Sequence, residues 1–220
     1  GGVDDALRQL AASAAAGARG VKVWKDLGLG VRVDGARLMP DDPRVVRVLQ
    51  ETGALGLPVL IHTADPMAFF APLDERNERL DELAAQPDWW FGDPRAHPTF
   101  DALLDALGAL VQHAPGTTFV GAHMASLAED LDRLASLLDA LPNLVVDTGG
   151  RMAELGRQPR GFARLVARHP DRVLFGSDAY PADRDAWQRW WRFLETDDEA
   201  FDYEDGDVPS QGRWQVAAAA

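Results

Sequence analysis

Three residues that can bind a metal or move a proton each follow a short apolar run in this sequence. His62 follows Pro-Val-Leu-Ile, His123 follows Phe-Val-Gly-Ala, and Asp178 follows Val-Leu-Phe-Gly-Ser. Each run has the length and composition of a buried parallel strand, so each polar residue lies where such a strand ends. Because a β/α barrel presents its active-site residues at the carboxyl ends of its strands, we expect the three side chains to meet at one site.

Two imidazoles and a carboxylate are donors that suit zinc, iron(II) or manganese, and the chain has no cysteine. His62 and Asp178 are the candidate metal ligands. A metal-bound water loses a proton near neutral pH, and His123 is the candidate base that positions or deprotonates it, or a further ligand. A single histidine at a strand end is more often structural, so this prediction depends on the three residues together. Since a catalytic metal needs at least three protein ligands, the sequence predicts only part of a metal site.

Three more side chains are candidates for binding the substrate. Lys25 and Trp24 end the run that begins at Val21, and Arg151 follows the later run Leu-Val-Val-Asp. The two cations could bind a substrate carboxylate, and arginine does so with two parallel hydrogen bonds. The alternatives are a solvated lysine and, for the arginine, a structural network with the nearby Glu154 and Arg157.

Helices and strands alternate along the chain, which predicts an α/β fold with a parallel sheet and helices outside it. Strands are expected at 21–24, 58–62, 117–122, 143–147 and 172–177. Helices are expected at 3–18, 43–55, 103–111, 127–141, 159–168 and 187–194. Ser126 and Glu129 match a capping box at the start of the fourth helix, and Asp147 is expected to cap the polar loop 148–158.

The segment 63–97 is longer than an ordinary connection and contains the aromatic residues Phe69, Phe70, Trp89 and Trp90. Its charged stretch near 74–86 is expected to be a helix. Long connections within a compact domain are usually functional or disordered, and the aromatic residues favour function. We therefore expect a lid-like insertion over the site, within a single domain that spans residues 1–220. The aromatic residues favour a sizeable, partly apolar substrate.

Composition excludes several functional classes. The net charge of −13 argues against binding to nucleic acid, because a phosphate backbone requires a basic surface. No run of 18 apolar residues and no basic-then-apolar leader occurs, so no membrane span is expected and a cytoplasmic location is the default. The expected partner is a small molecule, with self-association into a homo-oligomer left open.

Five segments resemble the amidohydrolase-related family, in the branch of the amidohydrolase superfamily that includes aminocarboxymuconate-semialdehyde decarboxylase-like enzymes. They are KVWKDLGL, PVLIHTADP, FVGAHM, NLVVDTGGRMAELGRQP and VLFGSD, and they occur in the family's order. The resemblance implies a TIM (β/α)8-type barrel with one divalent metal, most commonly Zn²⁺. It also implies that His62 and Asp178 are metal ligands, that His123 acts on water or substrate, and that Asp178 carries the proton.

One departure from this family pattern concerns the first strand, where the family has a His-x-His pair of metal ligands. No His-x-His occurs in the 220 residues. The chain therefore resembles strands 4 to 8 of an N-terminally truncated or degenerate member. The leading expectation is a metal-dependent hydrolase acting on an amide, ester or lactone carbonyl. The alternatives are a non-oxidative decarboxylase of the same superfamily and a non-catalytic barrel fragment or scaffold.

Overall fold

Five parallel strands form one sheet in the computed structural model, which describes residues 2–181, 184–203 and 214–219. The strands lie side by side in chain order, each parallel to the next. They are β1 (Val21–Val23), β4 (Val59–Ile61), β5 (Phe119–Gly121), β6 (Leu144–Asp147) and β7 (Val173–Leu174). All five predicted strands are therefore present. The last is shorter than predicted, because pairing with β6 ends at Leu174.

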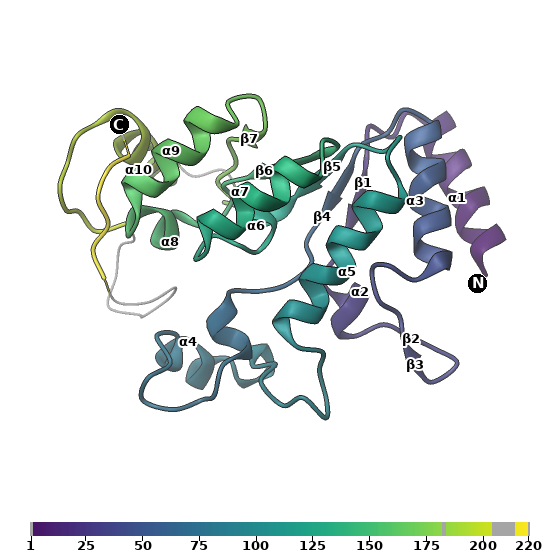
Figure 1. The fold of residues 1–220 in the computed structure, drawn as a ribbon, viewed down its shortest axis with the longest axis horizontal. Coiled ribbons are helices and arrows are strands. Elements are labelled where there is room, and N and C mark those ends of the chain that lie inside the picture. The colour runs from purple at the N-terminus through teal and green to yellow at the C-terminus, as the bar shows by residue number, and fades with distance from the viewer. Residues whose placement is uncertain (1, 182–183, 204–213, 220) are drawn as a thin grey trace.

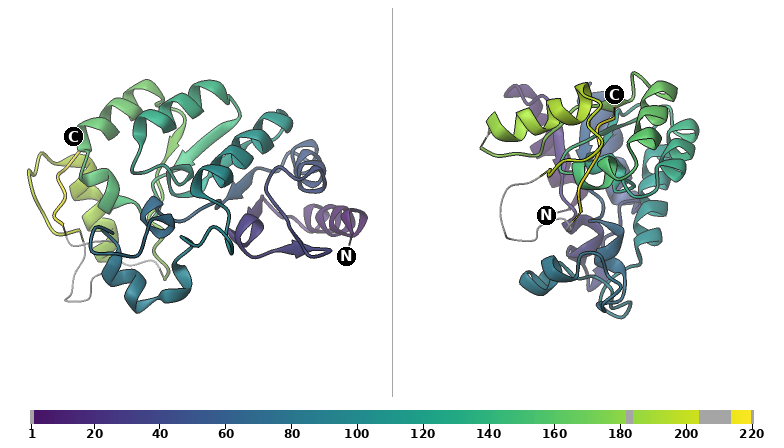
Figure 2. Two further views of the ribbon diagram at one scale, coloured as in Figure 1. Left: turned by 60° about the horizontal axis from the view of Figure 1, so that its bottom comes forward. Right: turned by 90° about the vertical axis from the view of Figure 1, so that its left-hand side faces the viewer.

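Each connection between neighbouring strands of this sheet contains a helix, as expected for parallel pairing. These helices are α3 (Pro43–Ala54), α5 (Phe100–His113), α7 (Leu131–Ala140) and α9 (Pro159–Arg168), and Figure 1 shows them in the same order as the strands. Helix α1 (Val3–Ala15) packs against α3, and α10 (Arg184–Glu195) follows the last strand. The two views of Figure 2 show these helices along the outside of the sheet.

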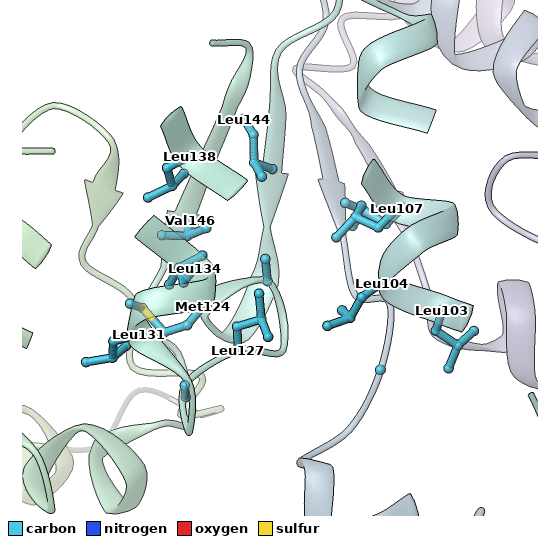
Figure 3. Packing of buried hydrophobic residues seen from close by; sticks show 14 of the residues in the cluster. Leu103, Leu104, Leu107, Met124, Leu127, Leu131, Leu134, Leu138, Leu144 and Val146 are labelled. Carbon is cyan, nitrogen blue, oxygen red and sulfur yellow. The ribbon is translucent and has the colours of Figure 1, made fainter. Parts of the chain in front are cut away.

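The hydrophobic core lies between the sheet and these helices. Alternate strand residues are buried there, among them Val59, Ile61, Phe119 and Val146. Figure 3 shows leucines of α5 and α7 directed toward this layer. Each fully buried leucine contributes roughly 1.5–3 kcal/mol to folding. The other strand positions point to the opposite face of the sheet. There Lys22, Leu60 and Val120 are paired side by side across three strands and line a pocket on that face.

Short elements fill the two long connections. Helix α2 (Asp26–Leu29) precedes a hairpin of β2 (Arg32–Val33) and β3 (Ala36–Arg37), which turns at Asp34 and Gly35, both with positive φ. The insertion contains two 3-10 turns, η1 (Met67–Phe70) and η2 (Pro87–Trp89), and a helix α4 (Leu80–Ala85).

The predicted charged helix at 74–86 is thus shorter than expected and begins only at Leu80. The physical reason is local, because Asn77 uses its side chain to bind two backbone carbonyls of the preceding turn.

Two further predictions about local structure are wrong. The polar loop 148–158 contains a buried helix, α8 (Met152–Gly156). The capping box is also absent, because α7 begins at Leu131 and is capped by Asp130, whose carboxylate accepts from the amide of Arg133. Ser126 and Glu129 instead bind the backbone after β4, at Ala64 and Met67 respectively. Tertiary contacts have replaced the local cap.

Candidate active site

A pocket of about 160 Å³ at the carboxyl ends of the strands brings five of the six predicted site residues together. Its lining comprises Lys25, His62, Asp65, Pro66, Phe69, Arg79, Glu82, Trp89, His123, Gly150, Arg151 and Asp178. The sixth, Trp24, is 61% exposed and lies beside the pocket, with its ring centroid 6.2 Å from that of His62. The expected meeting of His62, His123 and Asp178 at one edge of the sheet is therefore present.

His123 occupies an unusual backbone position directly after β5. It begins a turn, labelled α6 (Ala122–Ala125), in which His123, Met124, Ala125 and Ser126 all have φ between 51° and 63°. Left-handed backbone costs non-glycine residues roughly 1–2 kcal/mol each, so the surroundings must hold it. Gly121 permits the tight return, because a Cβ there would lie 2.7 Å from the Cβ of Ala125.

The imidazole of His123 is held in one tautomer. Its Nδ1 lies 2.7 Å from the carbonyl oxygen of Gly149, and since a carbonyl can only accept, Nδ1 must carry the proton. The lone pair is then on Nε2. The ring centroid lies 4.4 Å from that of His62, edge to face. His123 is thus a buried, oriented imidazole with one nitrogen free to accept a proton.

Hydrogen bonds link the loops that follow neighbouring strands. The hydroxyl of Ser126 donates to the carbonyl of Ala64 at 2.5 Å and accepts from its amide at 3.1 Å. The hydroxyl of Thr148 likewise donates to the carbonyl of Gly176 at 2.9 Å and accepts from its amide at 3.1 Å. The first pair of bonds joins the loops that carry His62 and His123, and the second joins the loop after β6 to the loop that carries Asp178.

Asp65 was not singled out by sequence reasoning, yet it connects two predicted residues. It lies 2.5 Å from the ammonium of Lys25 and 3.4 Å from Nε2 of His62. Burial alone would raise the pKa of Asp65, but contact with His62 and the charge of Lys25 outweigh it and hold that pKa below its usual range. Its position three residues after His62, directly beyond a strand, was the available signal. Lys25 is therefore an ion-paired lysine at the pocket wall.

Arg151 and its neighbours divide between binding and structure. Glu154 pairs with the buried Arg79, and Arg157 pairs with Glu78 at 2.7 Å and covers the ring of Trp214. Both therefore have structural partners, but these partners lie in the insertion, and among the described ion pairs none joins Arg151, Glu154 and Arg157 to one another as the alternative interpretation expected. Arg151 takes no part in these ion pairs.

Arg151 is 7% exposed and lines the pocket. Its guanidinium donates to the carbonyl of Gly150, and no carboxylate among the described residues lies within 4 Å of it. A buried guanidinium that faces a cavity is able to bind a ligand anion.

The insertion forms one wall of this pocket through buried contacts. Phe69, Leu83 and Arg79 of this segment are all buried, and Phe69 stacks on Trp89 at 6.2 Å between ring centroids. Arg79 gave no sequence signal, since it lies in a run of charged residues that resembles a solvated surface. Only the fold shows that it reaches across to α8.

The charge state of His123 gives a pH prediction. Burial, with the charges of Arg151 and His62, lowers the pKa of His123 from 6.5 to about 4. Between these values the unfolded chain binds a proton that the folded chain does not, so the free energy of unfolding should fall as pH drops from 6.5 to 4. The full difference corresponds to about 3 kcal/mol, and this group contributes no slope above pH 6.5. NMR titration should show a neutral His123 at pH 5.5, and a charged one would contradict this.

The described residues do not by themselves make a metal centre. Nδ1 of His62 is buried without a hydrogen-bond partner, and Nε2 is buried with only the 3.4 Å contact to Asp65, so a ring nitrogen of His62 could bind a cation. A catalytic metal takes at least three protein ligands. Within residues 2–181, 184–203 and 214–219, no three His, Cys, Asp or Glu side chains lie close enough to hold one ion. The roles of His62 and Asp178 as ligands stay predictions.

Comparison with known proteins relates this geometry to a family. The sequence profile of a family described as amidohydrolase matches residues 1–205. A 2,6-dihydroxybenzoate decarboxylase from Rhizobium has a TM-score of 0.52 and 18% identity, over 86% of this chain and 60% of its own. An uncharacterised TIM-barrel protein from Bordetella bronchiseptica has a TM-score of 0.49 and 17% identity, over 86% of this chain and 59% of its own. Amidohydrolase 2 from Bifidobacterium longum subsp. infantis has a TM-score of 0.41 and 16% identity, over 81% of this chain and 61% of its own.

No curated protein matches the sequence. The chain spans about three fifths of the length of these three structures. The predicted fold class is confirmed, namely an α/β barrel type of which this chain forms an incomplete part, with five parallel strands. In the described part of the chain, no helix is both long and apolar enough to cross a bilayer.

Proposed function

The chain belongs to the amidohydrolase family, and we propose that it is part of a metal-dependent hydrolase. In this proposal the enzyme activates water to attack the carbonyl carbon of an amide, ester or lactone. The observation that carries the proposal is the neutral His123, whose Nδ1 proton is held by Gly149 and whose Nε2 is free in a pocket shared with His62 and Asp178. A base needs this combination of orientation and protonation state.

The chain's own residues would then carry out proton transfer. Nε2 of His123 takes a proton from water as the water oxygen bonds to the carbonyl carbon and the carbonyl electron pair moves to its oxygen. The electron pair on the oxyanion then re-forms the carbonyl and expels an amine or alkoxide, which takes the proton back from the imidazolium, directly or through a relay by the carboxylate of Asp178. Positioned acid–base catalysis of this kind contributes typically 10²–10⁴-fold.

The metal is a separate part of the proposal. We assign His62 and Asp178 as ligands of one divalent cation, most commonly zinc in this family, together with donors outside the described residues. A divalent cation at such a site lowers the pKa of water and polarises a carbonyl. Metal analysis of the purified full-length protein tests this. One bound equivalent supports it, and full turnover without metal would refute it.

A non-oxidative decarboxylase is the second candidate, favoured by the buried Arg151 at the pocket, because its substrate carries a carboxylate. Turnover in ¹⁸O-labelled water separates the two reactions. Hydrolysis places the label in the product, whereas decarboxylation releases carbon dioxide and adds no water. The panel should contain lactones, esters, amides and hydroxylated aromatic acids. No turnover of any of them by metal-loaded full-length protein would favour the non-catalytic alternative.

The proposed role of Arg151 predicts that the enzyme discriminates between charged and neutral substrates. Lys25 and Trp24 are proposed to border the same subsite. Arg151→Met should raise KM about 10- to 100-fold for a carboxylate-bearing substrate, since hydrogen bonds to charged groups contribute about 1.5–3 kcal/mol. KM for a neutral analogue should change little. Arg157→Met is the matched control, because Arg157 is paired with Glu78 and lies outside the pocket lining. Equal losses for charged and neutral substrates would contradict the assignment.

A further inference from the structure

One carboxylate oxygen joins the two loops that hold the imidazole of His123. Oδ1 of Asp147, at the end of β6, accepts from the amide of His123 at 3.0 Å and from the amide of Gly149 at 2.9 Å. The carbonyl of Gly149 in turn accepts from Nδ1 of His123 at 2.7 Å. Asp147, His123 and Gly149 therefore form a closed ring of hydrogen bonds between β5 and β6, which we call the Asp147 clasp.

The clasp fixes two properties of His123 at once. Its first bond holds the backbone of His123 in the left-handed conformation at φ 58°, which fixes where the side chain starts. Its second bond orients the peptide of Gly149, so that the following carbonyl meets Nδ1. The nitrogen that carries the proton in a neutral imidazole is set by the hydrogen bond that it makes. Removing Oδ1 would leave the amide of His123 without this acceptor and Gly149 free to turn.

The loop-capping role predicted for Asp147 therefore has a consequence at the site. We propose that Asp147 is a positioning residue for His123, which acts through the backbone to hold the Nδ1-protonated tautomer and leave Nε2 as the base. The catalytic part of this inference rests on the proposed function. The tautomer itself can be measured without substrate.

The position of the oxygen and the charge of the carboxylate can be separated by two variants. Asp147→Asn removes the charge but keeps an oxygen at the place of Oδ1, and a single oxygen accepts both bonds. Asp147→Glu keeps the charge but moves it by one methylene. The clasp predicts that the asparagine variant retains the tautomer and that the glutamate variant loses it. An effect of charge alone predicts the reverse.

The experiment is ¹⁵N NMR of histidine-labelled full-length protein at pH 7.5, with His123→Asn to assign the resonances. We expect a protonated Nδ1 and an unprotonated Nε2 in the wild type and in Asp147→Asn. In Asp147→Glu we expect conversion toward the Nε2-protonated form, and a kcat at least tenfold below that of Asp147→Asn. Asp42→Ala is the control, because Asp42 accepts from the amide of Arg44 at the start of α3, away from the site. It should change thermal stability without changing the tautomer.

Each outcome bears on the proposal. An unchanged tautomer in Asp147→Glu, or a changed one in Asp147→Asn, overturns it. A shifted tautomer with undiminished turnover supports the clasp but refutes His123 as the base, so failure of the inference is distinguishable from failure of the proposed function.

Discussion

Replacing His123 with asparagine should lower kcat about 10²- to 10⁴-fold, the range expected for loss of a positioned general base. The fold should survive, because asparagine tolerates the left-handed backbone that this position requires. Its side-chain amide can also donate to the carbonyl of Gly149 in place of Nδ1. The substitution thus removes Nε2 while keeping the loop, and kcat measured with the identified substrate reports the loss of the base.

The matched control for this variant is His113→Asn. His113 ends α5 on the exposed surface, outside the pocket lining, so kcat should not change. His123→Asn should also reduce the loss of stability between pH 6.5 and 4, since the buried neutral imidazole is its source. If kcat stays within threefold of the wild-type value, His123 is not the base.

The expectation that active-site residues lie at the carboxyl ends of parallel strands predicted the centre of this site, because it depends only on the order in which the strands pair. His62 and His123 each follow a buried strand, and those strands are neighbours in a parallel sheet, so their ends meet. The ring centroids at 4.4 Å confirm that meeting. Composition and alternation likewise sufficed for the layers of the fold, because a parallel sheet between helices needs only apolar runs of the right lengths.

Side chains whose partners are distant in sequence could not be predicted in the same way. Ser126 and Glu129 match a local cap, but in the structure their side-chain oxygens accept from the backbone amides of Ala64 and Met67 instead. No spacing rule connects residues about 60 positions apart. The left-handed turn follows from these contacts and not from local propensity, which disfavours it.

The same limit applied to the charged residues around Arg151. Arg151, Glu154 and Arg157 lie on one short stretch, and sequence alone left open whether they bind a substrate or one another. The structure separates them, because two find partners in the insertion, at Arg79 and Glu78. Both partners belong to a run of charged residues whose sequence resembles a solvated surface. Burial, which decides the role of each, appears only in three dimensions.

Replacing Glu154 with alanine should destabilise the fold by about 3–5 kcal/mol, the cost of leaving a buried charge without its partner. Glu154 is fully buried and Arg79 is 1% exposed, and their ion pair joins α8 to the insertion that walls the pocket. The remaining bond from Arg79 to Glu82, at 3.0 Å, places the expected value toward the lower end. Urea unfolding of the full-length protein measures it.

Two comparisons separate the charge effect from a loss of packing. Arg79→Met with Glu154→Leu removes both charges and refills the space, so it should recover most of the stability lost in Glu154→Ala. Arg76→Ala removes an ion pair with Asp74 whose side chains are 84% and 38% exposed, and it should change stability by less than about 1 kcal/mol. A double variant no more stable than Glu154→Ala would show that packing, and not the unpaired guanidinium, accounts for the loss. Recovery would show that the ion pair specifies how the insertion docks and adds little net stability of its own.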